Sequence, residues 1–176
     1  MNQLKVLITR EQIAAKVAEL GARISADFAG QSVVLIGVLK GAAIFLADLA
    51  REIDLDVSFD FIAVSSYGNS TQSGELELIK DVDESLEGRN VILVEDILDT
   101  GVTLTYIKNL LLARGPKSFK IVALLDKTSR RKVPITADYV GFEIPDRFVV
   151  GYGLDLGQRY RNLPHVCTME EPNDRT

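Results

Sequence analysis

Apolar residues recur along the chain in two patterns, one typical of amphipathic helices and one typical of buried strands. In the N-terminal part they return every three or four residues, which predicts a helix with one buried face. Thr9, followed three residues later by Gln12, matches a capping box and indicates where this helix begins. The apolar positions that define its buried face are Ile13, Val17, Leu20, Ile24 and Phe28.

Continuous apolar runs elsewhere predict strands that are buried on both faces. They cover residues 32–39, 90–97 and 119–127. Helical patterns follow the first two runs, at residues 42–52 and 103–115. Apolar strands that alternate with helices predict an α/β domain with a mostly parallel central sheet flanked by helices. Ligands of such sheets bind at the carboxyl ends of the strands.

The middle of the chain carries a different pattern. Residues 56–68 and 75–80 are expected to form two strands, joined by the polar, glycine-flanked stretch GNSTQSG. We expect that stretch to be a mobile loop. The chain has 176 residues, the usual length of one compact domain, so residues 1–176 are expected to form a single domain.

Composition narrows the classes of function. The single histidine, His165, and the single cysteine, Cys167, leave no His/Cys metal cluster and no internal disulfide, so any metal is expected to be a hard ion on oxygen ligands. The formal charge of −5 argues against a nucleic-acid partner, and the most basic run, residues 127–131, is expected to be an exposed loop. Without an apolar run of about 18 residues or a signal-peptide pattern, we expect a cytoplasmic protein with no membrane partner.

Three carboxylates crowd the end of the predicted strand at residues 90–97. Glu95 and Asp96 fall at its carboxyl end, and Asp99 falls in the turn before residues 100–103, Thr-Gly-Val-Thr. Threonine hydroxyls, backbone N–H groups and the positive end of a helix dipole favour a phosphate in that turn. The acids suit ribose hydroxyls or hydrated Mg²⁺, so a sugar phosphate would satisfy both halves. The alternative is that the acids only cap the next helix, which leaves Glu95 and Asp96 unexplained.

The stretch VILVEDILDTGVT resembles the 5-phosphoribosyl-1-pyrophosphate (PRPP) signature of the phosphoribosyltransferases: an apolar strand, two acids, two apolar residues, then Asp-Thr/Ser-Gly-x-Thr. Other segments resemble the hypoxanthine-guanine phosphoribosyltransferases in the same order, and the resemblance covers roughly residues 10–166. These segments are GVLKGAAIFLADL, SSYGNST, LLDK, VGFEIPDRFVVGYGLD and RYRNLPHV.

This resemblance implies a phosphoribosyltransferase-type fold, with a small base-binding hood from about residues 140–176 and a flexible lid at residues 65–74. It also implies Mg²⁺-dependent transfer of the 5-phosphoribosyl group from PRPP to N9 of hypoxanthine or guanine. The products are then IMP or GMP and pyrophosphate. Small-molecule substrates and a homodimer or homotetramer are implied in the same way.

The resemblance also assigns residues to PRPP and to two Mg²⁺ ions. The ribose hydroxyls and one Mg²⁺ fall to Glu95 and Asp96, and the second Mg²⁺ falls to Asp155. The pyrophosphate falls to Lys40, Gly41 and Arg161, and Leu39-Lys40 becomes a candidate cis peptide. The 5′-phosphate loop consists of Asp99, Thr100, Gly101 and Thr103.

For the purine, the resemblance makes Asp99 the base that takes the N7 proton and Lys127 the donor to the 6-oxo group. An ammonium at that place would face a donor on adenine, which favours 6-oxopurines. Phe148 would stack on the ring and the Val149 backbone would bond its edge, while Ser66 and Tyr67 would belong to the lid. Taken without the resemblance, Lys127 would be a solvated strand end and Phe148 a core residue.

Other functions stay open at this point. A related transferase could use xanthine or a pyrimidine, although LLDK and FVVGYGLD argue against a pyrimidine. A non-catalytic regulator could sense PRPP and bind RNA or a protein, but the acidic charge argues against RNA. A Mg²⁺-dependent phosphohydrolase would need a nucleophile that the sequence does not reveal.

Overall fold

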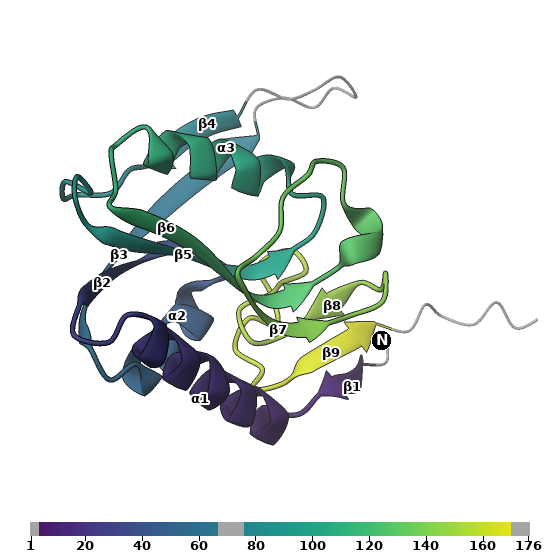
Figure 1. The fold of residues 1–176 in the computed structure, drawn as a ribbon. Helices are drawn as coiled ribbons and strands as arrows, with labels where there is room; N and C mark the ends of the chain where they lie inside the picture. The colour runs from purple at the N-terminus through teal and green to yellow at the C-terminus, as the bar shows by residue number, and fades with distance from the viewer. Residues whose placement is uncertain (1–3, 67–75, 170–176) are drawn as a thin grey trace, which may run out of the picture.

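The computed structural model describes residues 4–66 and 76–169. Within these residues it contains helices and strands in an order that alternates through most of the chain (Figure 1). In chain order they are β1 (Leu4–Ile8), α1 (Arg10–Asp27), β2 (Ser32–Val38), α2 (Ala43–Glu52), β3 (Asp56–Ser66), β4 (Leu76–Lys80), β5 (Asn90–Leu98), α3 (Val102–Leu112), β6 (Ser118–Asp126), the 3₁₀ turn η1 (Thr128–Arg130), β7 (Tyr139–Glu143), β8 (Val149–Val150) and β9 (Val166–Met169).

The main sheet has the strand order β4-β3-β2-β5-β6-β7. Its neighbours pair in parallel except β3 and β4, which are antiparallel. Helices α1 and α2 lie on one face of this sheet and α3 lies on the other, so the domain has three layers (Figure 1). The α/β class predicted from the sequence is confirmed.

The apolar runs of β2 and β5 serve both faces of the sheet at once. On β2, Leu35 packs into the core under α1 and α2, whereas the next residue, Ile36, packs into the core under α3. Ile92 and Leu93 of β5 divide between the two cores in the same way. Because each such side chain is fully buried, it contributes about 1.5–3 kcal/mol of transfer free energy. Burial on both faces explains why these strands lack polar alternation.

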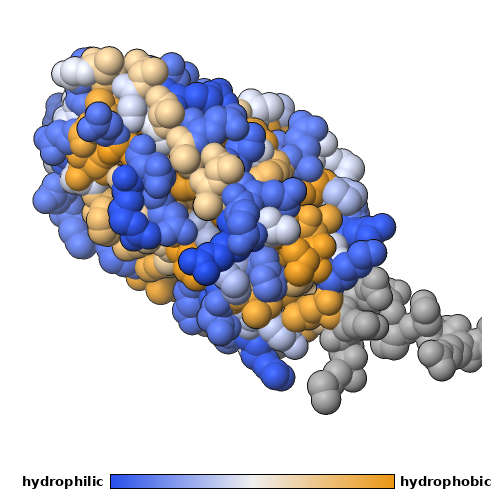
Figure 2. Space-filling model, turned by 90° about the horizontal axis from the view of Figure 1, so that it is seen from below, coloured by the Kyte–Doolittle hydropathy of each residue, from blue (hydrophilic) through white to orange (hydrophobic). Residues whose placement is uncertain are grey.

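Helix α1 begins at the predicted capping box. The Thr9 hydroxyl accepts a hydrogen bond from the Gln12 backbone N–H, and the Gln12 side chain accepts one from the Thr9 N–H. The predicted apolar positions are buried, although Phe28 is the residue that ends the helix. Seen from the side of α1, the molecule is largely hydrophilic, with apolar side chains in separate patches (Figure 2). In residues 4–66 and 76–169, no helix combines the length and apolarity needed to cross a membrane.

A second, antiparallel sheet has the order β1-β9-β8. It lies beside the carboxyl ends of the main strands (Figure 1). Strand β1 was not predicted, because five residues with weak alternation give no local signal of their pairing with β9. Residues after 140 thus share this sheet with residues 4–8.

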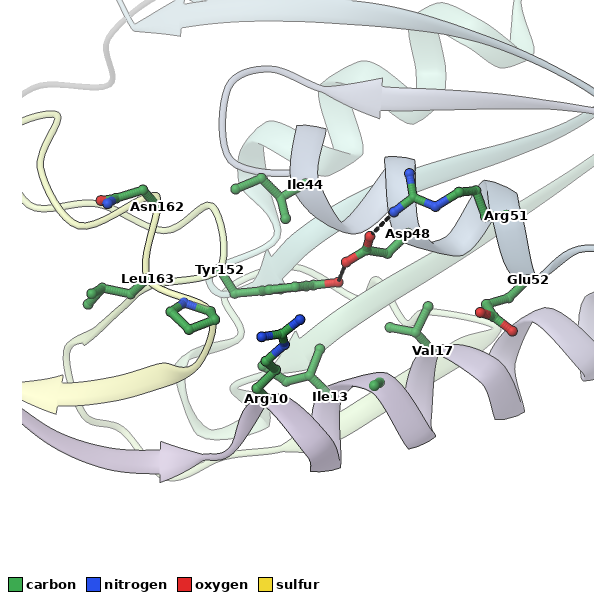
Figure 3. Close-up of a pocket in the computed structure, with 12 residues that line it drawn as sticks. Arg10, Ile13, Val17, Ile44, Asp48, Arg51, Glu52, Tyr152, Asn162 and Leu163 are labelled. Carbon is green, nitrogen blue, oxygen red and sulfur yellow. Dashed lines mark hydrogen bonds and ion pairs between the residues drawn. The ribbon is translucent and has the colours of Figure 1, made fainter.

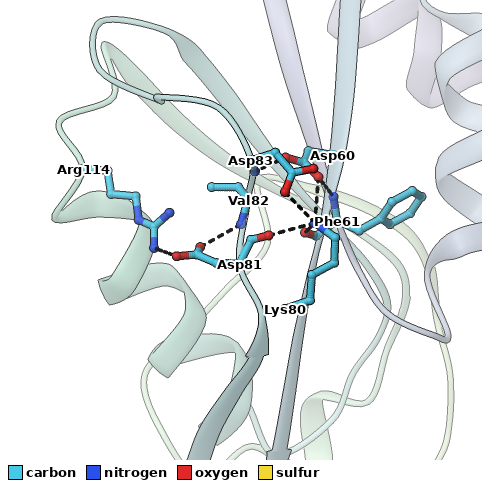
Figure 4. Close-up of polar contacts among 7 residues, drawn as sticks. All are labelled: Asp60, Phe61, Lys80, Asp81, Val82, Asp83 and Arg114. Atoms are coloured by element: carbon cyan, nitrogen blue, oxygen red, sulfur yellow. Dashed lines mark hydrogen bonds and ion pairs between the residues drawn. The ribbon is translucent and has the colours of Figure 1, made fainter.

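The antiparallel pair β3 and β4 is fastened at one end by a lysine (Figure 4). The ammonium of Lys80 donates to Oδ1 of Asp60 at 3.2 Å, to the Phe61 carbonyl at 3.2 Å and to the Asp81 carbonyl at 2.8 Å. The pairing register shifts between Ala63, which pairs with Lys80, and Val64, which pairs with Leu78. The lysine therefore fixes the end of the pair that lies away from the predicted lid at residues 65–74, of which residues 67–74 lie outside the described part.

The capping box gives a direct test of how much α1 depends on its start. Replacement of Thr9 by alanine removes an acceptor for a backbone N–H that has no helical partner, and should lower the free energy of unfolding by about 1 kcal/mol. For a domain of this size, thermal unfolding should shift by about 2–4 °C. Thr136→Ala, at an exposed loop position, is the matched control. Equal melting temperatures for the two variants would show that the box contributes nothing.

Candidate active site

Several of the residues singled out in the sequence lie at the ends of three adjacent strands, β2, β5 and β6. Because these strands are parallel, their carboxyl ends meet at one edge of the sheet (Figure 1). Lys40 and Gly41 follow β2, Asp99 follows β5, and Lys127 follows β6. The structure thus collects segments from distant parts of the sequence at the edge where ligands of such sheets bind.

Two carboxylates lie side by side near the carboxyl end of β5. Glu95 is 9% exposed and Asp96 is 8% exposed. The Asp96 backbone N–H donates to Oε1 of Glu95 at 3.1 Å, and the Ile97 N–H donates to Oδ1 of Asp96 at 2.7 Å. Burial, followed by the charge of Asp96, raises the pKa of Glu95 well above its usual value. Burial also raises the pKa of Asp96, opposed by its hydrogen bonds and by the charge of Arg161.

The loop after β2 passes directly over this carboxylate pair. A Cβ atom at Gly41 would lie 1.8 Å from Oδ2 of Asp96, so no larger residue fits there without a shift. The Leu39-Lys40 peptide, which the resemblance made a candidate, is cis. On the other side of the loop, Gly153 has φ +100°, and a Cβ atom there would lie 2.0 Å from the Gly41 carbonyl oxygen. Glycine at both places lets two backbones and a carboxylate meet.

Arg161 joins the turn after β8 to this loop. It donates to the Gly153 carbonyl at 2.6 Å and pairs with Oδ1 of Asp155 at 3.0 Å. Its Nε is buried and has no hydrogen-bond partner among the described residues. Gln158 accepts from Lys40 at 3.2 Å and from Arg161 at 3.3 Å. The three cation and glycine positions predicted for the pyrophosphate are therefore brought together, and Asp155 lies with Arg161.

Tyr152 fixes the turn after β8 to helix α2. Its hydroxyl donates to Asp48 on α2, and burial followed by this hydrogen bond raises the pKa of Tyr152. A pocket of about 530 Å³ lies beside this contact, between α1, α2 and residues 162–164 (Figure 3). None of the predicted site residues lines it. The site is therefore defined by the carboxylate pair and its neighbours. Figure 3 shows the contact between Tyr152 and Asp48, which holds the turn after β8 against α2.

The turn after β5 leads into α3 through a left-handed glycine. Gly101 is the N-cap residue with φ +83°, and among residues 4–66 and 76–169 no side chain forms an N-cap hydrogen bond to the helix. The alternative that the acids cap this helix is therefore wrong. Thr100 lies half-buried in the turn and Thr103 is exposed in the first helical turn. The first turn of this 11-residue helix thus presents backbone N–H groups beside two hydroxyls, one of which accepts from the Val102 N–H at 3.5 Å, and this is a suitable geometry for an anion.

Lys127 and Phe148 are placed differently from an ordinary strand end and a core residue. Lys127 is only 6% exposed, and its ammonium has no partner among residues 4–66 and 76–169. Its backbone N–H donates to the Leu98 carbonyl at 3.0 Å, which fixes it beside β5. Phe148 is 52% exposed, so the core alternative is wrong. Val149 follows in β8, where it is buried and pairs with Thr168.

The basic run at residues 127–131 was predicted to be an exposed loop. Thr128, Ser129 and Arg130 are exposed as predicted, whereas the two ends of the run, Lys127 and Arg131, are not. The Arg131 side chain is 16% exposed and pairs with the buried Asp126. Nε of Arg130 lies 2.9 Å from Oδ1 of Asp99, although this oxygen has no hydrogen bond in good geometry among the described residues. Acidic residues therefore pair with both arginines: Asp126 of β6 with Arg131, and Asp99 in the turn after β5 with Arg130.

The lid prediction is only partly within reach of the structure. Ser66 ends β3, is exposed and pairs with Leu76. Tyr67 lies outside the described residues.

Comparison with known proteins gives a consistent result. A family model described as "Phosphoribosyl transferase domain" matches residues 7–156. The hypoxanthine-guanine phosphoribosyltransferase of Bacillus subtilis (strain 168) is 56% identical over 167 residues, which cover 94% of this chain and 93% of that protein. The one from Staphylococcus aureus (strain Mu50 / ATCC 700699) is 50% identical over 171 residues and covers 96% of each chain.

Solved structures agree. A crystal structure of a hypoxanthine-guanine phosphoribosyltransferase from Bacillus anthracis superposes with a TM-score of 0.90 at 47% identity, over 97% of this chain and 100% of that one. A hypoxanthine phosphoribosyltransferase from Staphylococcus aureus gives 0.91 at 50% identity, over 94% and 91%. With such similarity over nearly the whole length, the chain belongs to the phosphoribosyltransferase family, in the group of the hypoxanthine-guanine phosphoribosyltransferases.

Proposed function

We propose that this protein transfers the 5-phosphoribosyl group from PRPP to N9 of hypoxanthine or guanine, and so makes IMP or GMP and pyrophosphate. Its relatives carry the names of enzymes with this activity. The observation that carries the proposal is the buried pair Glu95 and Asp96, set between a glycine-lined loop and a free helix N-terminus. A ligand with two hydroxyls and phosphates at both ends matches that arrangement.

PRPP would span the carboxyl edge of the sheet. Its 5′-phosphate would lie in the turn of Asp99, Thr100, Gly101 and Thr103, against the N-terminus of α3. Its pyrophosphate would lie at the other end, against Lys40, Gly41 and Arg161. The planar fork of an arginine suits phosphate oxygens, and the unpartnered Nε of Arg161 is available within the site.

Mg²⁺ fits the donor set of the site. Glu95 and Asp96 offer only oxygen ligands, and they are two like charges that burial makes costly without a cation. Among the described residues no three acids, histidines or cysteines cluster. Oxygens of PRPP would therefore complete the coordination at Glu95 and Asp96, and a second ion would use Asp155. When bound, Mg²⁺ supplies positive charge that stabilises the leaving pyrophosphate.

The purine would lie between the ends of β5 and β6. Lys127, buried and without a partner among the described residues, would donate to the 6-oxo group. Phe148 would stack on the ring and the Val149 backbone would bond its edge. Asp99 would then accept the N7 proton while N9 forms its bond to the anomeric carbon and the bond to pyrophosphate breaks. Water competes with N9, so closure by Ser66 and Tyr67 would protect the reaction.

The alternative functions are less well supported. A regulator without activity would not need Asp99 and Lys127 together with the PRPP loop. The phosphohydrolase alternative lacks support, because the relatives at 50–56% identity are named transferases. Xanthine stays a possible substrate alongside hypoxanthine and guanine, and an assay with separate bases decides between them.

The assembly and the cellular location are proposed together. We propose a homodimer or homotetramer in the cytoplasm, in line with the resemblance of the whole chain to its relatives. X-ray scattering at micromolar protein concentration would measure the mass of the assembly in solution.

The function is tested by absorbance changes on mixing the protein with PRPP, Mg²⁺ and one base at a time. We expect conversion of hypoxanthine and guanine but not adenine, and none after Mg²⁺ is removed. Asp99→Asn should lower kcat by about 10²–10⁴-fold, because an amide cannot accept the proton. Asp56→Asn, exposed at the opposite end of the sheet, is the control. PRPP binding with no turnover of any base would favour the regulator instead.

The role of Lys127 is tested by Lys127→Met. Loss of a charged hydrogen bond of about 1.5–3 kcal/mol should reduce kcat/KM for hypoxanthine by about 10–150-fold. The preference for hypoxanthine over adenine should shrink by a similar factor, since adenine gains nothing from the ammonium. Lys117→Met, at the other end of β6, should behave as the wild type. An unchanged preference between the two bases would contradict the assigned role.

A further inference from the structure

The segment that follows β6 runs back along the turn that follows β5. Three successive carbonyls of that turn accept hydrogen bonds from it. The Leu98 carbonyl accepts from the Lys127 N–H at 3.0 Å, and the Thr100 carbonyl accepts from the Lys132 N–H at 2.9 Å. Between them, the Asp99 carbonyl accepts from Nη1 of Arg131 at 2.9 Å. The middle bond is the only one of the three made by a side chain.

Arg131 connects the ends of the two strands. Its Nη1 also lies 3.3 Å from the Leu98 carbonyl, while its Nη2 pairs with Asp126, the last residue of β6. Both side chains are largely buried, at 16% exposed for Arg131 and 9% for Asp126. Burial raises the pKa of Asp126, and the charge of Arg131 opposes this rise. A planar guanidinium can bond a carboxylate and a carbonyl at once, which a lysine ammonium does with less fixed geometry.

The two residues on either side of this connection are those proposed to meet the purine. Asp126 precedes Lys127, and Arg131 bonds the backbone of Asp99 itself. The neighbouring Arg130 faces the Asp99 carboxylate at 2.9 Å. A shift of the Asp99 backbone relative to β6 would therefore change the distance between the proton acceptor and the 6-oxo donor. Such errors near 1 Å are costly, about 100-fold in rate.

We infer that Arg131, held by Asp126, is a positioning residue that sets Asp99 relative to Lys127 so that one purine reaches both. This inference rests on the proposed function. The phosphate turn also lies against Arg131, whose Cδ would be 3.2 Å from a Cβ atom at Gly101. Ile135 is closer to that position, however, at 2.4 Å, and the Lys132 backbone bonds Thr100 without any side chain. Loss of the Arg131 side chain should consequently affect the purine step more than PRPP binding.

The test compares Arg131→Met, Arg131→Lys and Asp126→Asn with Arg114→Met as a matched control. Arg114 is also a partly buried arginine in an ion pair, with Asp81 at 2.7 Å. Neither residue of that pair is assigned to the site. Arg131→Met should lower kcat/KM for hypoxanthine by about 10–100-fold, with KM for PRPP changed by less than about threefold. Arg131→Lys keeps the charge but loses the fork, and should still lose about tenfold.

The double variant Arg131→Met/Asp126→Asn should be no slower than Arg131→Met, because the two side chains act as one unit. Melting curves identify variants that do not fold, and in that case Arg131→Lys and Asp126→Asn decide. The inference is overturned if the folded Arg131 variants match Arg114→Met, or if KM for PRPP rises as much as kcat/KM for hypoxanthine falls. A wild-type protein that converts no base would instead overturn the proposed function, and the inference with it.

Discussion

The arrangement of this protein depends on two carboxyl groups buried at the end of an apolar strand. Glu95 and Asp96 lie in low-dielectric surroundings, where repulsion and lost hydration are both costly. Arg161 is the cation that opposes the pKa rise of Asp96, and Gly41 leaves room for the carboxylate beside the loop. A stable domain tolerates such a pair because β2, β5 and β6 bury apolar residues on both faces. The free site is thereby prepared for a cation and a polar ligand.

Most of the main sheet was predictable, because its signals are local. The runs at 32–39 and 90–97 read as buried strands, and the Thr9 capping box marks the start of α1. The second sheet was not predictable in the same way. Its strands have two to five residues, and β1 pairs with β9 across almost the whole chain, so nothing near either strand reveals the partner.

The same distinction between local and long-range features applies to the site. The acids and the glycine of residues 95–103 are contiguous, so their chemistry could be recognised before their geometry was known. The contact of Gly153 with the Gly41 carbonyl, and the hydrogen bond of Tyr152 to Asp48, join residues more than 100 positions apart and depend on the finished fold. Lys127 and Arg131, the two ends of the basic run, were misjudged because lysine and arginine are usually exposed, and only the structure places the carboxylate of Asp126 against Arg131.

The most direct test of the carboxylate pair is calorimetry of PRPP binding with Mg²⁺, in buffers of different ionisation enthalpy and over a series of pH values. The folded protein holds a proton on Glu95 more tightly than an exposed carboxylate would, since its pKa is raised. Binding of a cation beside it should lower this pKa, and so release protons in the pH range where the free site still holds one. We expect the wild type to release more protons than Glu95→Gln, and to bind PRPP weakly once Mg²⁺ is removed. Equal proton release by both proteins, with binding that ignores Mg²⁺, would contradict the role of the pair.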